Sequence, residues 1–92
     1  MAIHDDFLNR LEAQLSLEGK WPKVYMFKFI ILNNNRDYAI LRSIFNEDSI
    51  FTSRNSSKEK YISVTIKEMM MDAKEVMQRY RLAAEIEGIV AL

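Results

Sequence analysis

The alternation of apolar and polar residues is most regular in residues 23–32, which read Lys-Val-Tyr-Met-Phe-Lys-Phe-Ile-Ile-Leu. Aromatic and β-branched side chains suit the pleated surface of a strand, and ten residues is a long strand for a globular domain. Side chains alternate between the two faces of a strand. One face carries Tyr25, Phe27, Phe29 and Ile31, and the other carries Val24, Met26, Lys28 and Ile30. The aromatic face predicts a central strand that packs on a core, and the mixed face should be only partly covered.

Residues 5–17 have the three- and four-residue apolar spacing of an amphipathic helix. Asp5 and Asp6 suit the positive end of its dipole, and Gly19 followed by Pro22 is typical of a helix stop. Its polar face lacks the Lys and Arg of membrane-surface helices, so this helix should pack on protein. The apolar stripe consists of Phe7, Leu8, Leu11 and Leu15.

Two further helices are predicted. Three asparagines after residue 32 favour a loop that ends in an N-cap, and the helix that follows should reach about residue 46. Asp72 with Glu75 three residues later resembles a capping box at the start of the last helix. The buried stripes are Tyr38, Leu41, Ile44 and Phe45 in the first, and Ala73, Val76, Met77, Tyr80, Ala83 and Ala84 in the second.

Three more segments have strand character. Residues 49–54 are weakly apolar, as in an edge strand, and residues 61–67 alternate cleanly, as in a half-buried central strand. Residues 55–60 between them are polar and predict a hairpin loop. Residues 86–92 should form a final strand, with Gly88 at a bulge or a turn at its start.

The predicted order is a helix followed by β-α-β-β-α-β. Right-handed crossovers place both later helices on one face of the sheet. The fold class is therefore α+β, a ferredoxin-like two-layer sandwich with antiparallel strand order 4-1-3-2 and an extra N-terminal helix. We divide the chain into residues 1–20, the amphipathic helix and linker, and residues 21–92, the ferredoxin-like domain. The helix is expected to cover the mixed sheet face of its own chain or of a second copy, and we favour a homodimer because so small a core gains from association.

Composition narrows the functional classes. The chain has 92 residues, with 13 basic and 13 acidic side chains and no cysteine. Zero net charge argues against nucleic-acid binding, and the absence of cysteine removes disulfides and thiolate metal sites. The longest apolar run, residues 29–32, is too short to span a bilayer, and the acidic N-terminus does not resemble a signal peptide. We expect a cytoplasmic protein without cofactor or metal.

Several segments together match the pattern and spacing of a known family: Trp21-Pro22, Tyr25-Met26-Phe27-Lys28, Ser57, Tyr61-Ile62-Ser63-Val64-Thr65-Ile66, Val76, Tyr80 and Ile86-Glu87-Gly88-Ile89-Val90. In these segments the chain resembles the YbeD-like family of small uncharacterised bacterial proteins. The resemblance covers roughly residues 21–92. It implies the ferredoxin-like sandwich and a likeness to ACT domains, which sense small molecules in amino-acid metabolism. It implies no catalytic residues. Where ACT domains usually have glycine after the first strand, this chain has Asn33-Asn34-Asn35.

We therefore expect a non-catalytic regulatory or interaction module that senses a small metabolite or docks on a metabolic enzyme. The expected ligand contact is the loop Asn33, Asn34, Asn35 and Arg36, because a helix N-terminus presents unpaired N–H groups and a favourable dipole. Simple capping is the competing interpretation. His4 is the one histidine and is expected at a mobile terminus, which does not suit catalysis.

The open sheet face is the expected interaction surface, with Met26, Lys28, Ile30, Tyr61, Ser63 and Thr65. An RNA-binding domain is one alternative, but such domains stack bases on paired aromatic residues, and only Tyr61 is aromatic here. A hydrolase of acylphosphatase type is the other alternative. Its anion site would need a glycine-bearing loop with an arginine, whereas Arg36 follows three asparagines.

Two further groups are interpreted as ordinary surface and packing residues. Lys74, Arg79 and Arg81 are expected on the solvated side of the last helix. The run Met69-Met70-Met71 is expected to fill gaps at the end of a strand and the start of a helix.

Overall fold

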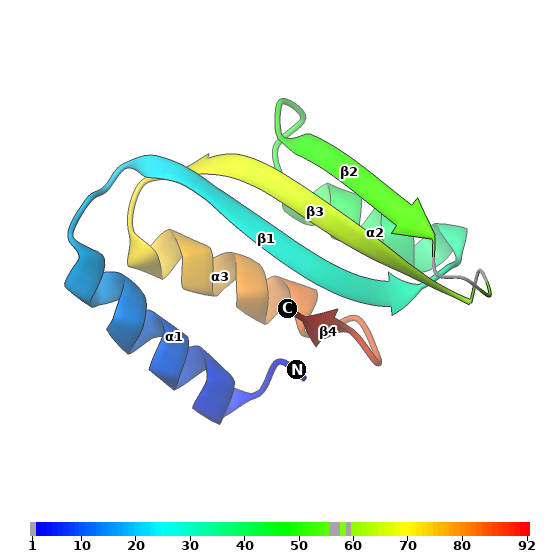
Figure 1. Cartoon of the computed structure of the whole chain (residues 1–92), viewed down its shortest axis with the longest axis horizontal. Helices are drawn as coiled ribbons and strands as arrows, with labels where there is room; N and C mark the ends of the chain where they lie inside the picture. The colour runs from blue at the N-terminus through cyan, green and yellow to red at the C-terminus, as the bar shows by residue number, and fades with distance from the viewer. Residues whose placement is uncertain (1, 56–57, 59) are drawn as a thin grey trace.

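The chain forms an α+β fold in which helices pack on one face of a four-stranded antiparallel sheet (Figure 1). The computed structural model describes residues 2–55, 58 and 60–92. Along this part of the chain the elements are α1 (Asp5–Glu18), β1 (Lys23–Leu32), α2 (Asn35–Ile44), β2 (Ile50–Asn55), β3 (Tyr61–Met70), α3 (Ala73–Ala83) and β4 (Val90–Ala91). The predicted order of elements is confirmed. Ser57, within the predicted hairpin loop, lies outside the described residues, as do residues 56 and 59.

The strands lie side by side in the order β2-β3-β1-β4, which is the predicted order read from the opposite edge. The two central strands pair along their whole lengths, from Lys23 opposite Met70 to Leu32 opposite Tyr61. They are also the two segments with the clearest period-two pattern. Local strand propensity and central position therefore agree, as expected of a sequence that specifies one fold.

The hydrophobic core lies between the sheet and the helices. The central strands contribute Phe27, Phe29, Ile31, Ile62, Val64 and Ile66, all of them buried. The α3 stripe is buried as predicted, except for Ala84, which follows the helix and is exposed. In the methionine run, Met70 is buried in the core while Met69 and Met71 are exposed. Among the described residues, no helix is long and apolar enough to cross a membrane.

Helix α1 packs beside α3 in the helix layer, so the expectation that it covers the mixed sheet face is wrong for this chain (Figure 1). Phe7 contacts the ring of Tyr80 edge to face, with 5.7 Å between centroids. Leu8 and Leu15 are buried in the common core. The physical reason is that α1 buries its apolar side chains against α3 and in the common core, so its stripe needs no second surface. The opposite face of the sheet is left open.

The last strand is shorter than predicted, because the segment before it forms consecutive turns. The N–H of Ile86 donates to the carbonyl of Ala83, and the N–H of Ile89 donates to that of Ile86. Gly88 has φ 79°, a left-handed conformation that glycine adopts without steric cost. Gly88 therefore lies in a turn before β4, one of the two alternatives expected from the sequence.

Arg79 does not lie on a solvated face, contrary to expectation. Its side chain is 14% exposed, ion-paired with Glu68 of β3, and its guanidinium donates to the carbonyl oxygen of Ile44 at 3.2 Å. It also lies 5.4 Å from the ring centre of Phe45. Helical spacing alone did not reveal these partners because they come from α2 and β3.

Candidate functional site

The sheet surface opposite the helices is the candidate site, and we refer to it as the open face. It comprises Val24, Met26, Lys28, Ile30 and Leu32 of β1, Ile50, Thr52 and Arg54 of β2, and Tyr61, Ser63, Thr65, Lys67 and Met69 of β3. The six residues expected there from the sequence all belong to it, and the register brings them together. Lys28 lies opposite Thr65, and Ile30 lies opposite Ser63. The sequence interpretation omitted the β2 residues, although hairpin pairing with β3 could have located them.

One end of the open face is apolar. We call Val24, Met26, Ile50 and Met69 the apolar patch; each is between 53% and 61% exposed. The register makes them neighbours, since Val24 pairs with Met69 and both Met26 and Ile50 pair with Lys67. These four apolar side chains lie on three adjacent strands around Lys67, which separates Met26 from Ile50, and water solvates them poorly.

The middle of the open face is polar and basic. A depression of about 310 Å³, here the Lys28 hollow, is lined by Lys28, Thr52, Ser53, Arg54, Ser63 and Thr65. Thr52 pairs with Thr65 and Arg54 pairs with Ser63, so the two cations come from the strands that flank β3. The hollow therefore combines two positive charges with several hydroxyl groups.

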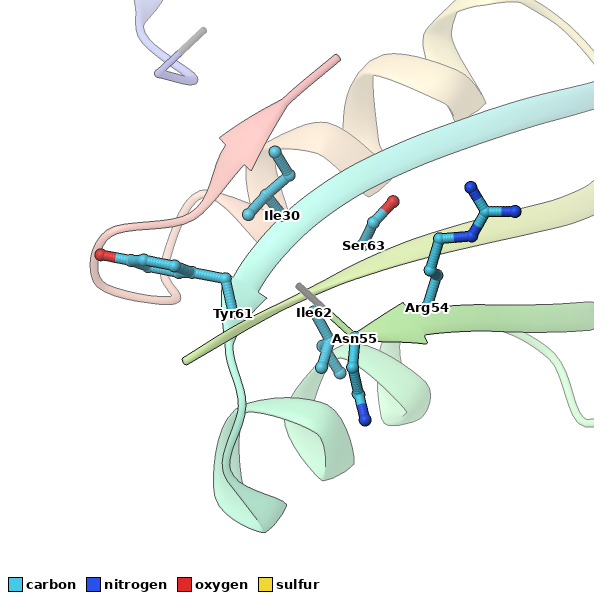
Figure 2. Close-up of a pocket in the computed structure, with 6 residues that line it drawn as sticks. All are labelled: Ile30, Arg54, Asn55, Tyr61, Ile62 and Ser63. Atoms are coloured by element: carbon cyan, nitrogen blue, oxygen red, sulfur yellow. The ribbon is translucent and has the colours of Figure 1, made fainter. Parts of the chain in front are cut away.

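A second depression of about 350 Å³ adjoins the first and shares Arg54 and Ser63 with it. This Ile30 hollow is lined by Ile30, Arg54, Asn55, Tyr61, Ile62 and Ser63. Figure 2 shows Ile30, Ser63 and Arg54 projecting to one side of the sheet, while Ile62 projects to the other. The walls of the Ile30 hollow are largely hydrocarbon, in contrast to those of the Lys28 hollow.

The charges of the open face have one sign. Lys28, Arg54 and Lys67 all lie on it, and its thirteen residues named above include no carboxylate. Three cations elsewhere are paired with acidic groups: Lys23 with Glu18, Arg36 with Asp37, and Arg79 with Glu68. Within the described part of the chain, the side chains of Lys28, Arg54 and Lys67 have no ion-pair partner. The strand residues of this face therefore carry three positive charges, and Asp48 lies at its edge, in a depression shared with Val24, Ile50, Lys67 and Met69.

The loop at the start of α2 is organised as a helix cap. The side chain of Asn34 accepts a hydrogen bond from the N–H of Asp37 at 2.7 Å, and the N–H of Asn33 donates to the carbonyl of Lys60. Asn35 is the first residue of the helix, and Arg36 is largely exposed and paired with the buried carboxylate of Asp37 at 3.4 Å. This geometry favours capping, because the Asn34 side chain occupies the N–H of Asp37 and Arg36 is already paired with a carboxylate.

The titratable groups with raised pKa values lie on the core side of the sheet. The hydroxyls of Tyr25 and Tyr80 are 3.1 Å apart. Burial raises the pKa of both tyrosines, strongly for Tyr80, whose hydrogen bond to Tyr25 raises its pKa further. These groups stabilise the fold and do not reach the open face.

His4 caps α1, where its Nδ1 accepts a hydrogen bond from the N–H of Phe7 at 3.4 Å. The expected mobility of this terminus stays a prediction. Over residues 2–55, 58 and 60–92, no group of three or more His, Asp or Glu side chains is arranged to hold a metal ion.

Comparison of the chain with protein-family models, with characterised proteins and with solved structures finds no match. The resemblance to the YbeD-like family therefore stays a prediction.

Proposed function

We infer that this chain is a cytoplasmic, non-catalytic interaction module of ferredoxin-like architecture that docks on a partner protein through the apolar patch. The observation that carries the proposal is the exposure of Val24, Met26, Ile50 and Met69 as one surface. Contiguous apolar surface that water must solvate is characteristic of protein interaction sites. A regulatory role of ACT-like type is the form of this function that the sequence resemblance favours.

The engagement of the candidate catalytic groups supports a non-catalytic role. His4 is used as a helix cap, and Arg36 is paired with Asp37. Acylphosphatase chemistry would need the arginine to meet a phosphoryl group, but the neighbouring carboxylate repels an anion at that position. The docking interpretation does not depend on either residue.

The charge of the open face indicates the chemistry of the partner. Lys67 lies between Met26 and Ile50 in the register, so a partner surface of apolar side chains with a carboxylate near its centre would complement the patch. Stacking two copies of this face would bring like charges together. That arrangement costs free energy, so we favour a different protein over a second copy of this chain.

The test is site-specific photo-cross-linking in the native cell. A photoreactive residue at position 26 should give one discrete adduct with another protein, and the same residue at position 82 should not. Leu82 is a matched control because it is an exposed apolar residue on α3, away from the sheet.

Binding to the identified protein should then be measured by calorimetry with purified components. Met26→Lys should weaken it roughly tenfold or more, as expected for a central contact, and Leu82→Lys should leave it unchanged. The proposal fails if positions 26 and 82 give the same adducts or none. An adduct of the chain with itself, together with a dimer in light scattering, would instead favour the homodimer.

A further inference from the structure

The Lys28 hollow has the composition of an anion site. Lys28 and Arg54 approach it from opposite sides of β3, and Thr52, Ser63 and Thr65 supply hydroxyl donors between them. Guanidinium and ammonium groups bind phosphate oxygens through charge-assisted hydrogen bonds, and hydroxyls can donate to the remaining oxygens. No carboxylate of the open face competes for these donors.

The side chains of Lys28 and Arg54 are also available. Neither forms an ion pair within the described residues, whereas Lys23, Arg36 and Arg79 each have a carboxylate partner. Positive charges gathered on a surface without counter-charges raise the local concentration of anions. A chain of zero net charge would not concentrate anions in this way if its charges were evenly mixed.

The Ile30 hollow provides room for the rest of a ligand. It adjoins the Lys28 hollow at Arg54 and Ser63, and Ile30 and Tyr61 give it an apolar wall (Figure 2). Each depression, about 310 and 350 Å³, lies at the lower end of the range for small-molecule sites. A ligand that spans both would place a charged group beside the cations and an apolar or aromatic group beside Ile30.

We propose that the Lys28 hollow binds the phosphate group of a small phosphorylated metabolite whose apolar or aromatic body lies in the Ile30 hollow. The inference rests on the proposed function in one respect, that the open face is the binding surface. It concerns the middle of that face and the hollow beyond it, and none of their lining residues belongs to the apolar patch, so each proposal can fail while the other stands.

The test uses the whole chain, labelled with nitrogen-15, and amide chemical shifts. The probes are phenyl phosphate, inorganic phosphate and phenol. Phenyl phosphate should shift the amides of residues 28, 52, 54, 63 and 65 and those around Ile30. Inorganic phosphate should shift the amides of residues 28, 52, 54, 63 and 65 more weakly. Phenol at equal concentration should shift neither these amides nor those around Ile30.

Variants separate a site from general attraction to a basic surface. Arg54→Gln and Lys28→Gln should each weaken phenyl phosphate binding roughly tenfold, because each removes a charge-assisted hydrogen bond. Lys67→Gln is the matched control, since it removes the same charge from the same face outside the hollow and should change affinity less than about twofold, the effect expected of a screened exposed charge. Met26→Lys, which tests the docking proposal, should leave the chemical-shift changes in place.

Three outcomes would overturn the inference. The first is shifts confined to residues 33–38, which would assign the anion to the α2 loop. The second is equal weakening by Arg54→Gln and Lys67→Gln, which would indicate non-specific attraction. The third is much tighter binding of an eight-nucleotide oligouridine than of phenyl phosphate, with shifts across the whole open face, which would indicate a nucleic-acid surface.

Discussion

The guanidinium of Arg79 lies 2.8 Å from the carboxylate of Glu68, and the two side chains are 14% and 5% exposed. The second carboxylate oxygen accepts a hydrogen bond from the N–H of Asn46 at 2.8 Å. Glu68 therefore joins three segments: its own strand β3, helix α3 through Arg79, and the chain leaving α2 through Asn46. The carboxylate of Glu68, on the core side of the sheet, thus fixes α3 and the segment after α2 to β3.

Removing one partner of this ion pair should be costly. Glu68→Ala is expected to lower the free energy of unfolding by about 3 to 5 kcal/mol, because it leaves a mostly buried guanidinium without its counter-charge. Urea denaturation monitored by circular dichroism measures the change. The double variant Glu68→Met with Arg79→Met should lose less than the two single substitutions added together, since it removes both charges. Additive losses would show that the pair is not coupled.

The hydrogen-bonded tyrosines make stability fall at alkaline pH. Their pKa values are raised in the folded state from a reference of 10.0, so the folded chain holds these protons more tightly than the unfolded chain. The stabilisation is complete below about pH 10 and is lost as the pH rises above that value. Denaturation midpoints between pH 8 and pH 11 should decline, and Tyr80→Phe should make that decline shallower. An unchanged slope would contradict the assignment.

The N-cap of α2 can be tested by substituting each of two adjacent asparagines, Asn34 and Asn35, with alanine. Asn34→Ala removes the acceptor for the N–H of Asp37 and should destabilise the fold by about 1 kcal/mol. Asn35→Ala, at the first helical position, should have little effect or a slight benefit, because alanine favours helix. Thermal melting distinguishes the two. Equal losses would mean that the Asn34 side chain is not the cap.

Two leucines of α1 test whether this helix belongs to the core. Leu15 is 4% exposed and Leu17 is 88% exposed on the same helix. Leu15→Ala should cost about 2 to 5 kcal/mol, through lost burial and the cavity that remains, while Leu17→Ala should be near neutral. Urea denaturation provides both values. A small loss at Leu15 would mean that α1 contributes little to the folded core.

The sequence was most informative about features that depend only on residues within a single strand or helix. The alternation in residues 61–67 predicted the buried side of β3, and Asp72 was correctly placed at the start of α3, where its side chain accepts from the N–H of Glu75 at 2.9 Å. Both features depend on residues close together in the chain. The apolar stripe of α1 showed equally well that the helix packs on protein.

The sequence could not identify partners that come from distant segments. The stripe of α1 is compatible with the sheet or with α3, and the contact that joins it to α3, between Phe7 and Tyr80, links residues far apart in the chain. Glu68 lies beyond the predicted end of β3, and its polar character gave no sign of burial. At the candidate site, Lys28, Ser63 and Thr65 were expected from the sequence, but Arg54 enters only through the register between β2 and β3.

The three cations among the strand residues of the open face should make the charge distribution of this neutral molecule uneven. Since the whole chain balances 13 basic against 13 acidic residues, three cations on one surface leave an equal excess of acid on the remainder. The electric field of an anionic partner should orient the molecule during association, so that the open face meets the partner first. It should also be retained by a cation exchanger at a pH where its net charge is zero, because one side binds while the other faces solvent.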